Sequence, residues 1–196
     1  MKRAHCQSPE VIPLMHIRQT IAEGSIELLL GNIVDQQVDA IVNAANASLL
    51  GGGGVDGAIH DAAGPDLLEA CRQLPTDSEG LRCPTGEARS TAAFDLPARW
   101  VIHAVGPVYN PDSHEESCRL LLATYRSSLD LAHDLGCESI AFPAISTGAY
   151  QFPLQEAASI AVSSARTYLE ACSTPTLIRF VLFGQPEWDV FRQAID

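Results

Sequence analysis

Two stretches of this 196-residue chain combine glycine, carboxamide, hydroxyl and carboxylate groups at spacings that suit the binding of an anion. In residues 43–60, four consecutive glycines (Gly51–Gly54) lie between Asn46 and Asp56. Glycine has no Cβ and can adopt positive φ, so backbone N–H groups in such a run can close on a ligand oxygen. A helix that begins near Val55 would point its positive end at the same place. The stretch predicts an anion site built without basic side chains.

Glycines before a helix often form only a tight turn, so the neighbouring side chains matter. Asn43, Asn46, Asp56 and His60 lie in a segment otherwise made of small and apolar residues. Polar groups in such a segment either cap the backbone or face a ligand. No Lys-Ser or Lys-Thr follows the glycines. This absence argues against a nucleoside-triphosphate loop.

The second stretch, residues 144–153, leaves one predicted strand and leads into a helix that Pro153 would start. Ser146, Thr147 and Gly148 can present N–H and hydroxyl donors, and Tyr150 and Phe152 flank them with aromatic rings. A Ser-Thr-Gly run alone carries little information. Its position after a strand, like that of the glycine run, predicts a second loop able to present N–H donors to a phosphate.

Alternation of strand-like and helix-like segments predicts how these loops are positioned. Apolar runs predict strands at residues 25–30, 38–42, 88–94, 100–106, 137–143 and 176–183. Helices are expected from residue 55, over 66–73, 113–136, 153–171 and 184–196, with a capping box at Ser113 and Glu116. This order predicts an α/β fold, a three-layer α/β/α domain with a mixed, mostly parallel central sheet.

Residues 1–24 differ in character from the rest and are predicted to be an N-terminal extension, partly ordered, ahead of one domain over residues 25–196. A short helix is expected at residues 11–17. The formal charge of −12 repels a phosphate backbone, so we expect no extended contact with nucleic acid. Six cysteines without a C-x-x-C pair, and no leader or membrane-spanning run, predict a reduced, cytoplasmic protein with no membrane contact.

Several other reactive side chains are better explained by structure than by chemistry. Cys83 and Glu87 start a predicted strand without a histidine close by in the sequence, which favours structural roles. His103 lies within an apolar strand, where an imidazole is usually a hydrogen-bonded core group. The histidines lack a His-x-x-x-His pair, so no metal site is expected.

The pattern N-A-A-N-x-x-L-x-G-G-G-G-V-D-G-A-I-H at residues 43–60 resembles the phosphate-binding and catalytic loop of the macrodomain family, in the MacroD-type branch that hydrolyses ADP-ribosyl esters. The C-P-T-G-E-A segment at residues 83–88 and the Ser146–Gly148 loop are also similar to family segments, and the resemblance runs from Ile26 to the C-terminus. The chain departs from the family at Asn32, where an Asp is usual, and at Gln151-Phe152, where Gly-Tyr or Gly-Phe is usual.

The resemblance implies roles for individual residues. Asn46 would bind hydroxyls of the distal ribose, Asp56 would orient or activate the attacking water, and Tyr150 would close over the ribose. Phe183 would stack on adenine, with a core position as the alternative. The ligand-binding set implied is Asn32, Ile33, Asn43, Gly51, Gly52, Gly53, Gly54, Val55, Ser146, Thr147, Gly148, Ala149 and Phe183.

The implied function is that of a hydrolase without a cofactor that removes mono-ADP-ribose from acidic protein side chains, deacetylates O-acetyl-ADP-ribose, or does both. The expected partners are therefore ADP-ribose and ADP-ribosylated proteins or O-acetyl-ADP-ribose, bound by a monomer. A non-catalytic module that only reads ADP-ribose is the alternative. An interaction domain would not need the polar residues of the glycine loop.

Overall fold

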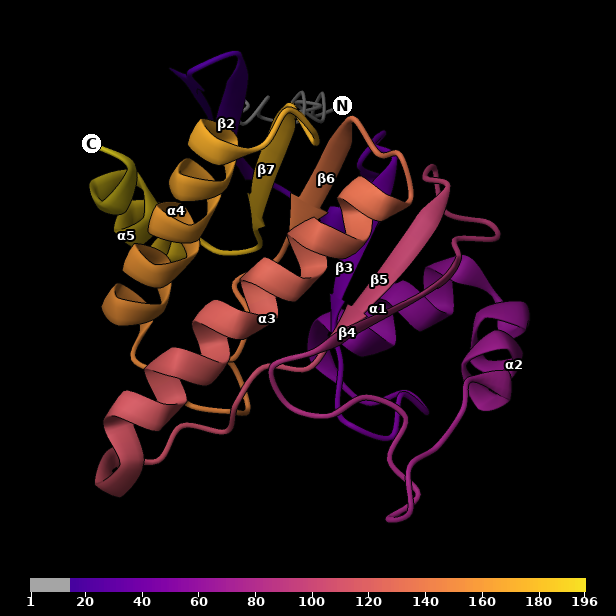
Figure 1. Ribbon diagram of the computed structural model, residues 1–196. Coiled ribbons are helices and arrows are strands. Elements are labelled where there is room, and N and C mark those ends of the chain that lie inside the picture. The colour runs from indigo at the N-terminus through magenta and orange to yellow at the C-terminus, as the bar shows by residue number, and fades with distance from the viewer. Residues whose placement is uncertain (1–14) are drawn as a thin grey trace, which may run out of the picture.

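The computed structural model describes residues 15–196, which form a seven-stranded sheet between two layers of helices (Figure 1). The strands are β1 (His16–Ile21), β2 (Gly24–Leu30), β3 (Ala40–Ala44), β4 (Ala88–Ala92), β5 (Trp100–Ala104), β6 (Ser139–Phe142) and β7 (Leu177–Leu182). The helices are α1 (Gly54–Ala63), α2 (Pro65–Gln73), α3 (His114–Asp134), α4 (Leu154–Ala171) and α5 (Gln185–Ile195). Two 3₁₀ turns are η1 (Ile33–Asp35) and η2 (Pro111–Ser113).

The sheet is mixed and mostly parallel, as predicted. Its strand order is β1-β2-β7-β6-β3-β5-β4. The five strands from β2 to β5 in this order run parallel to one another, and only the edge strands β1 and β4 are antiparallel to their neighbours. Because parallel strands share one carboxyl edge, the segments that follow β2, β3, β5, β6 and β7 all meet there.

Both faces of the central strands are covered, which explains their nearly continuous apolar sequence. Side chains alternate between the faces, so neighbours in sequence join different clusters. Val42 packs with residues of α3, α4 and α5, whereas Ile41 packs with Ile59 of α1 and Leu67 of α2. Figure 1 shows α3, α4 and α5 on the near side of the sheet. The predicted three-layer architecture is confirmed.

Two local predictions are wrong. The described part of residues 11–17 begins strand β1, which pairs with β2, so the expected helix is absent from residue 16 onward; residues 11–14 lie outside the described range. Ser113 occupies the N-cap position of α3, but its side chain makes no capping hydrogen bond. The turn η2 places Ser113 at ψ 44°, and Glu116 instead accepts hydrogen bonds from Arg119 at 2.6 and 2.7 Å.

The described part of the chain contains five α-helices. None of them combines the length and the apolar composition that crossing a bilayer requires.

A buried ion pair joins β2 to β7. Glu27, only 4% exposed, accepts a hydrogen bond through Oε2 from Nε of Arg179 at 2.8 Å, and the same oxygen lies 2.8 Å from Nη2 in an ion pair. The two residues are register partners in the parallel pairing. Desolvation makes such a pair a weak source of net stability, yet removal of one partner leaves the other charge buried.

We therefore expect Arg179→Met to lower the free energy of unfolding by about 3 kcal/mol. The double variant Glu27→Leu/Arg179→Met should lose clearly less, because no buried charge remains unpaired; Arg18, which also contacts Glu27, is exposed. Arg126→Met, which removes an exposed ion pair with Asp130, is the control and should cost under about 1 kcal/mol. Urea unfolding measures all three; equal losses in the single and double variants would contradict the expectation.

Candidate functional site

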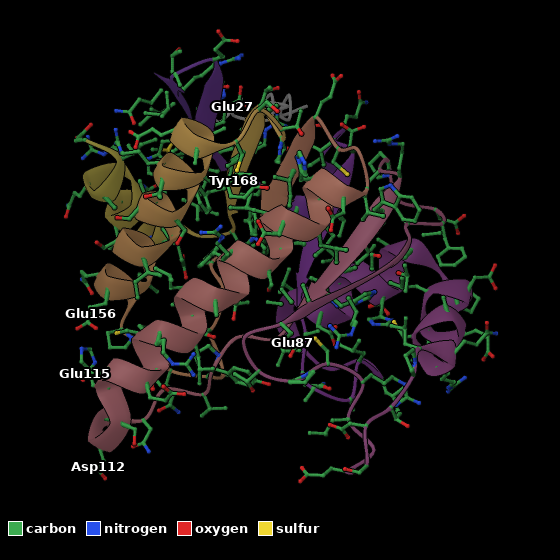
Figure 2. All side chains as sticks on the ribbon, viewed as in Figure 1. Glu27, Glu87, Asp112, Glu115, Glu156 and Tyr168 are labelled. Atoms are coloured by element: carbon green, nitrogen blue, oxygen red, sulfur yellow. The ribbon has the colours of Figure 1, made fainter. Side chains whose placement is uncertain are left out.

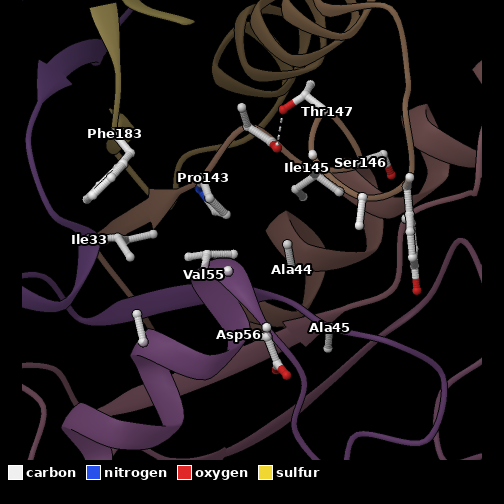
Figure 3. A pocket seen from close by; sticks show the side chains of 18 of the residues that line it. Ile33, Ala44, Ala45, Val55, Asp56, Pro143, Ile145, Ser146, Thr147 and Phe183 are labelled. Carbon is white, nitrogen blue, oxygen red and sulfur yellow. Dashed lines mark hydrogen bonds between the residues drawn. The ribbon is translucent and has the colours of Figure 1, made fainter.

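A cavity of about 780 Å³ lies at the carboxyl edge of the sheet. Its lining comes from the segments that follow β2, β3, β5, β6 and β7, together with the first turns of α1 and α5. Its size falls in the range of about 300–1,000 Å³ that small-molecule sites occupy. In Figure 3, Phe183 and Ile33 lie at one side of the cavity, with Val55 between them and Ala44, and Asp56 below.

Most of the residues predicted for the site line this cavity. They are Asn32, Ile33, Asn46, Gly52, Gly53, Gly54, Val55, Asp56, Ser146, Thr147, Gly148, Ala149, Tyr150 and Phe183. Asn43 and Gly51 are outside the lining. Asn43 is fully buried because its side chain points back toward Asp56 and His103, and the carbonyl of Gly51 is occupied by Asn46.

The side chain of Asn46 holds the glycine loop in shape. Its Nδ2 donates to the carbonyl of Gly51 at 2.9 Å, and its Oδ1 accepts from the N–H and the hydroxyl of Ser48 at 3.0 and 2.6 Å. Positive φ is found at Gly51 (87°) and Gly54 (61°). Gly52 and Gly53 do not have positive φ, and Gly53 is extended at φ −108°. Positive φ is therefore confined to the first and last glycines of the run.

The two loops present unused backbone donors to the cavity. Within residues 15–196, the N–H groups of Gly52–Val55 and of Ser146–Ala149 have no acceptor. Those of Gly54 and Val55 belong to the first turn of α1, where the helix dipole adds a positive potential. Backbone N–H groups gathered in this way form a site for an anion.

Asp56 lies beside this group of donors in the first turn of α1. It is 4% exposed, and its Oδ1 accepts from Nδ2 of Asn43 at 2.6 Å and lies 3.7 Å from Nε2 of His60. Its Oδ2 has no hydrogen-bond partner in the described part of the chain. A Cβ added to Gly52 would lie 3.0 Å from this Oδ2 and 3.5 Å from Nδ2 of Asn46, so both polar atoms border the same small space.

The hydrogen bonds continue from Asn43 into the core. Nδ2 of Asn43 also lies 3.2 Å from Nδ1 of His103, which must accept because an amide nitrogen only donates. The proton of the imidazole is then on Nε2, 3.0 Å from Oγ1 of Thr91. Burial, with a smaller contribution from His60, lowers the pKa of His103 to about 3. His103 is a neutral, hydrogen-bonded core group, as the sequence indicated, and it positions Asn43.

Cys83 and Glu87 do not line the cavity, and their contacts agree with the structural roles expected of them. Cys83 is fully buried, and this burial raises the pKa of its thiol to about 11. A thiol with that pKa stays protonated at neutral pH and is a poor nucleophile. Glu87 pairs with Arg89 at 2.8 Å on the surface.

The second loop takes its shape from two residues with left-handed φ. Ser146 has φ 65° and Gln151 has φ 55°. The macrodomain pattern usually has glycine at the position of Gln151. Glycine adopts this left-handed conformation without strain, which explains why it is usual there. Ser146 Oγ is buried without a partner among residues 15–196, and it occupies the space where Gly106 would carry a Cβ. Thr147 Oγ1 donates to the carbonyl of Ala144 at 3.0 Å (dashed in Figure 3).

The end of the cavity that holds Phe183 is apolar, apart from one acidic residue that was not predicted. Phe183 is 86% exposed, so the alternative of a core position for this ring is wrong. Asn32 caps η1 by accepting from the N–H of Val34 at 3.3 Å. Glu187, in the first turn of α5, also lines the cavity and was not predicted. The only feature of the sequence that points to Glu187 is its position shortly after Phe183, where a helix was expected to begin.

Comparison with known sequences places these features in a family. The sequence profile of the Macro domain matches residues 42–161. A macro domain-containing protein from Xanthomonas axonopodis pv. citri is 51% identical over 170 residues, 87% of this chain and 94% of that protein. One from Methanosarcina mazei is 48% identical over 179 residues, 91% of this chain and 92% of that protein.

Solved structures agree with the sequence relatives. The Oceanobacillus iheyensis macrodomain with ADP superposes with a TM-score of 0.88 at 40% identity, over 93% of this chain and 95% of that chain. The Trypanosoma brucei macrodomain in complex with ADP-ribose gives 0.77 at 42% identity, over 87% of this chain and 69% of that chain.

The protonation of His103 can be tested directly. Its folded pKa of about 3 lies below the value of about 6.5 expected in the unfolded chain, so protonation favours unfolding. The contribution of His103 to stability is therefore full above pH 6.5 and is lost as the pH falls toward 3.

We expect the ring signals of His103 in NMR spectra to stay constant from pH 8 to about pH 5 and to report a proton on Nε2, with the exposed His133 as the reference. A midpoint near 6.5 for His103, or a proton on Nδ1, would rule out this hydrogen-bonding pattern.

Proposed function

This chain belongs to the macro domain family, and from that premise we propose that its cavity binds ADP-ribose. The complexes of the Oceanobacillus and Trypanosoma macrodomains with ADP and ADP-ribose support the choice of ligand. So does the chemistry of the cavity. A diphosphate needs many donors, and the free N–H groups of Gly52–Val55 and Ser146–Ala149 supply them from two sides.

The remaining parts of the ligand follow from this placement. Adenine stacks on Phe183 beside Ile33, because an exposed aromatic ring at the apolar end of a cavity offers the best surface for a planar base. The distal ribose then lies past the diphosphate, toward Asn46 and Asp56. Tyr150, from the second loop, lies on the lining where it can close over that ribose.

We propose further that the protein hydrolyses an ester at the distal ribose. The observation that carries this proposal is the unpartnered Oδ2 of Asp56, a buried carboxylate oxygen of a residue that lines the cavity. Buried polar atoms without a partner are rare, so this one has a reason to be there. Oδ1 holds the side chain in place through Asn43 while Oδ2 is left to accept a hydrogen bond from water.

The reaction balances with residues of this chain alone. Water forms a bond to the anomeric carbon of the distal ribose, the bond from that carbon to the carboxylate oxygen breaks, and Oδ2 of Asp56 takes the proton of the water. The products are ADP-ribose and a carboxylate. A carboxylate leaves as a stable anion, so the substrates we propose are mono-ADP-ribose on Asp or Glu side chains and O-acetyl-ADP-ribose. For an acetyl ester at another hydroxyl, the same water would attack the acetyl carbon, the bond from that carbon to the ribose oxygen would break, and the proton taken by Asp56 would pass to this oxygen to restore the hydroxyl.

A module that only reads ADP-ribose remains the alternative to a hydrolase, because binding needs only the donors and the aromatic ring. Incubation with a Glu/Asp-linked, automodified target separates the two functions. Release of ADP-ribose supports the hydrolase, and tight binding without release supports the reader.

The binding half of the proposal predicts the behaviour of Gly53→Val. A Cβ at this extended residue would meet no protein atom within 4 Å, so it projects into the open cavity. We expect unchanged thermal stability and at least about 100-fold weaker binding of ADP-ribose, the loss of roughly two hydrogen bonds to a charged group. Ala92→Val, on the edge strand β4, is the control. If calorimetry shows that Gly53→Val binds ADP-ribose with unchanged affinity, the diphosphate lies elsewhere.

The catalytic half predicts the behaviour of Asp56→Asn. The amide keeps the shape of Asp56 and can still accept from Asn43, but it cannot take a proton. We expect binding of ADP-ribose within a few-fold of the original protein and hydrolysis slower by ~10²-fold or more. Asp61→Asn, on the exposed side of the same helix, should behave as the original. Full turnover by Asp56→Asn would remove Asp56 from the mechanism.

A further inference from the structure

A cluster of three different metal-binding side chains lies outside the cavity, at the first turns of two helices. His114 and Cys118 are one turn apart on α3, and Glu156 extends from the first turn of α4. All three are at least partly accessible to solvent. Figure 2 shows Glu156 and Glu115 at the neighbouring ends of these helices. We refer to His114, Cys118 and Glu156 as the α3–α4 cluster.

The ligand atoms of the α3–α4 cluster are already close to the separations that a tetrahedral metal site requires. Sγ of Cys118 lies 3.7 Å from Nε2 and 4.0 Å from Nδ1 of His114. Oε2 of Glu156 lies 3.6 Å from Nδ1 of the same ring. Bonds of about 2.0–2.3 Å from zinc to sulfur, nitrogen and oxygen place such atoms roughly 3.3–3.8 Å apart. Small side-chain rotations would bring one ion within reach of all three.

Charge favours a divalent cation here. A thiolate and a carboxylate together cancel the charge of Zn²⁺, so the loaded site would be neutral and would not oppose the positive ends of the two helices. Glu115 and Asp112 add negative charge nearby, in a chain whose formal charge is −12. A sulfur, a nitrogen and an oxygen ligand are also a set that zinc accepts, whereas Mg²⁺ and Ca²⁺ prefer oxygen alone.

We propose that His114, Cys118 and Glu156 bind one Zn²⁺, with a fourth coordination position open to water. This site is separate from the ligand cavity and does not depend on the proposed function. It revises the expectation of no metal site, which rested on the lack of a His-x-x-x-His pair. The helical pair here is His-x-x-x-Cys, and the third ligand comes from a helix distant in sequence.

The site also has a physical connection to the second loop of the cavity. Tyr109 Oη lies 3.3 Å from Nδ1 of His114, and the ring of Tyr109 packs on Phe152 with centroids 5.1 Å apart. The N–H of Tyr109 donates to the carbonyl of Tyr150 at 2.9 Å. Glu156 follows the same loop where it enters α4. A metal that joins α3 to α4 would thus restrain this segment where it enters α4 and, through Tyr109, at Tyr150.

The test uses the full chain, reduced and stripped of metal by a chelator, and titrated with Co²⁺ and Zn²⁺ alone. Bound Co²⁺ should give a thiolate-to-cobalt charge-transfer absorption that Zn²⁺ displaces at one equivalent. Cys118→Ser should abolish this absorption, and Cys118→Ser, His114→Ala and Glu156→Gln should each weaken Zn²⁺ binding by at least about 100-fold, because even supporting residues of metal sites cost 10–100-fold. Zn²⁺ should raise the melting temperature of the original protein but not that of these three variants.

Two matched controls make the test specific. Cys172→Ser removes another half-buried thiol, and His133→Ala removes a histidine at the opposite end of α3; both should keep the absorption and the affinity. Circular dichroism without metal checks that every variant is folded. No charge-transfer absorption, or equal losses in Cys118→Ser and Cys172→Ser, would overturn the proposal and leave the cluster as an ordinary surface ion pair. Since the readouts are metal binding and stability, failure here would not affect the proposed hydrolase.

Discussion

The hydrogen bond from Asn43 to Asp56 is the interaction on which the site depends. It joins the end of β3 to the first turn of α1 across the glycine run, with 2.6 Å between Nδ2 and Oδ1. His103 holds the same amide from the core side, so Asn43 has one orientation. As a result, Asp56 has one oxygen fixed and one oxygen free, and the start of α1 faces the cavity. The buried amide and imidazole contribute to function through geometry rather than by touching a ligand.

A second constraint is electrostatic. A chain of formal charge −12 has to create a local site for an anion, and its side chains do not supply the positive charge along the cavity lining. The solution is backbone N–H groups left without acceptors at a helix start and in a neighbouring loop. Glycine makes this possible at Gly51 and Gly54 through positive φ, and at Gly53 by leaving space for the ligand. Donors of this kind are fixed in place before the ligand arrives, so little ordering is needed on binding.

The sequence predicts those features that arise from local pattern. Apolar runs, prolines and glycines located the strands and helices after residue 25 and both loops of the cavity. Features that depend on register or on distant contacts were not predictable. Strand β1 was missed because a short apolar run has no clear period, and only pairing with β2 decides its type. Asn43 was predicted to bind the ligand but lies outside the cavity lining, because the direction of its side chain depends on its position in β3. Glu187 and the α3–α4 cluster come together only in the folded chain.

The claim that unused backbone N–H groups hold the diphosphate can be tested most directly by amide NMR during titration with ADP-ribose. The account predicts that the largest shifts and the strongest gain in protection from solvent exchange occur at Gly52–Val55 and Ser146–Ala149, and that ribose 5-phosphate perturbs only a part of this set. Amides inside β2 and β7 should hardly move. If the strongest effects fall outside the two loops, or if the glycine amides remain unprotected at saturation, the diphosphate is not held by these donors and the account is wrong.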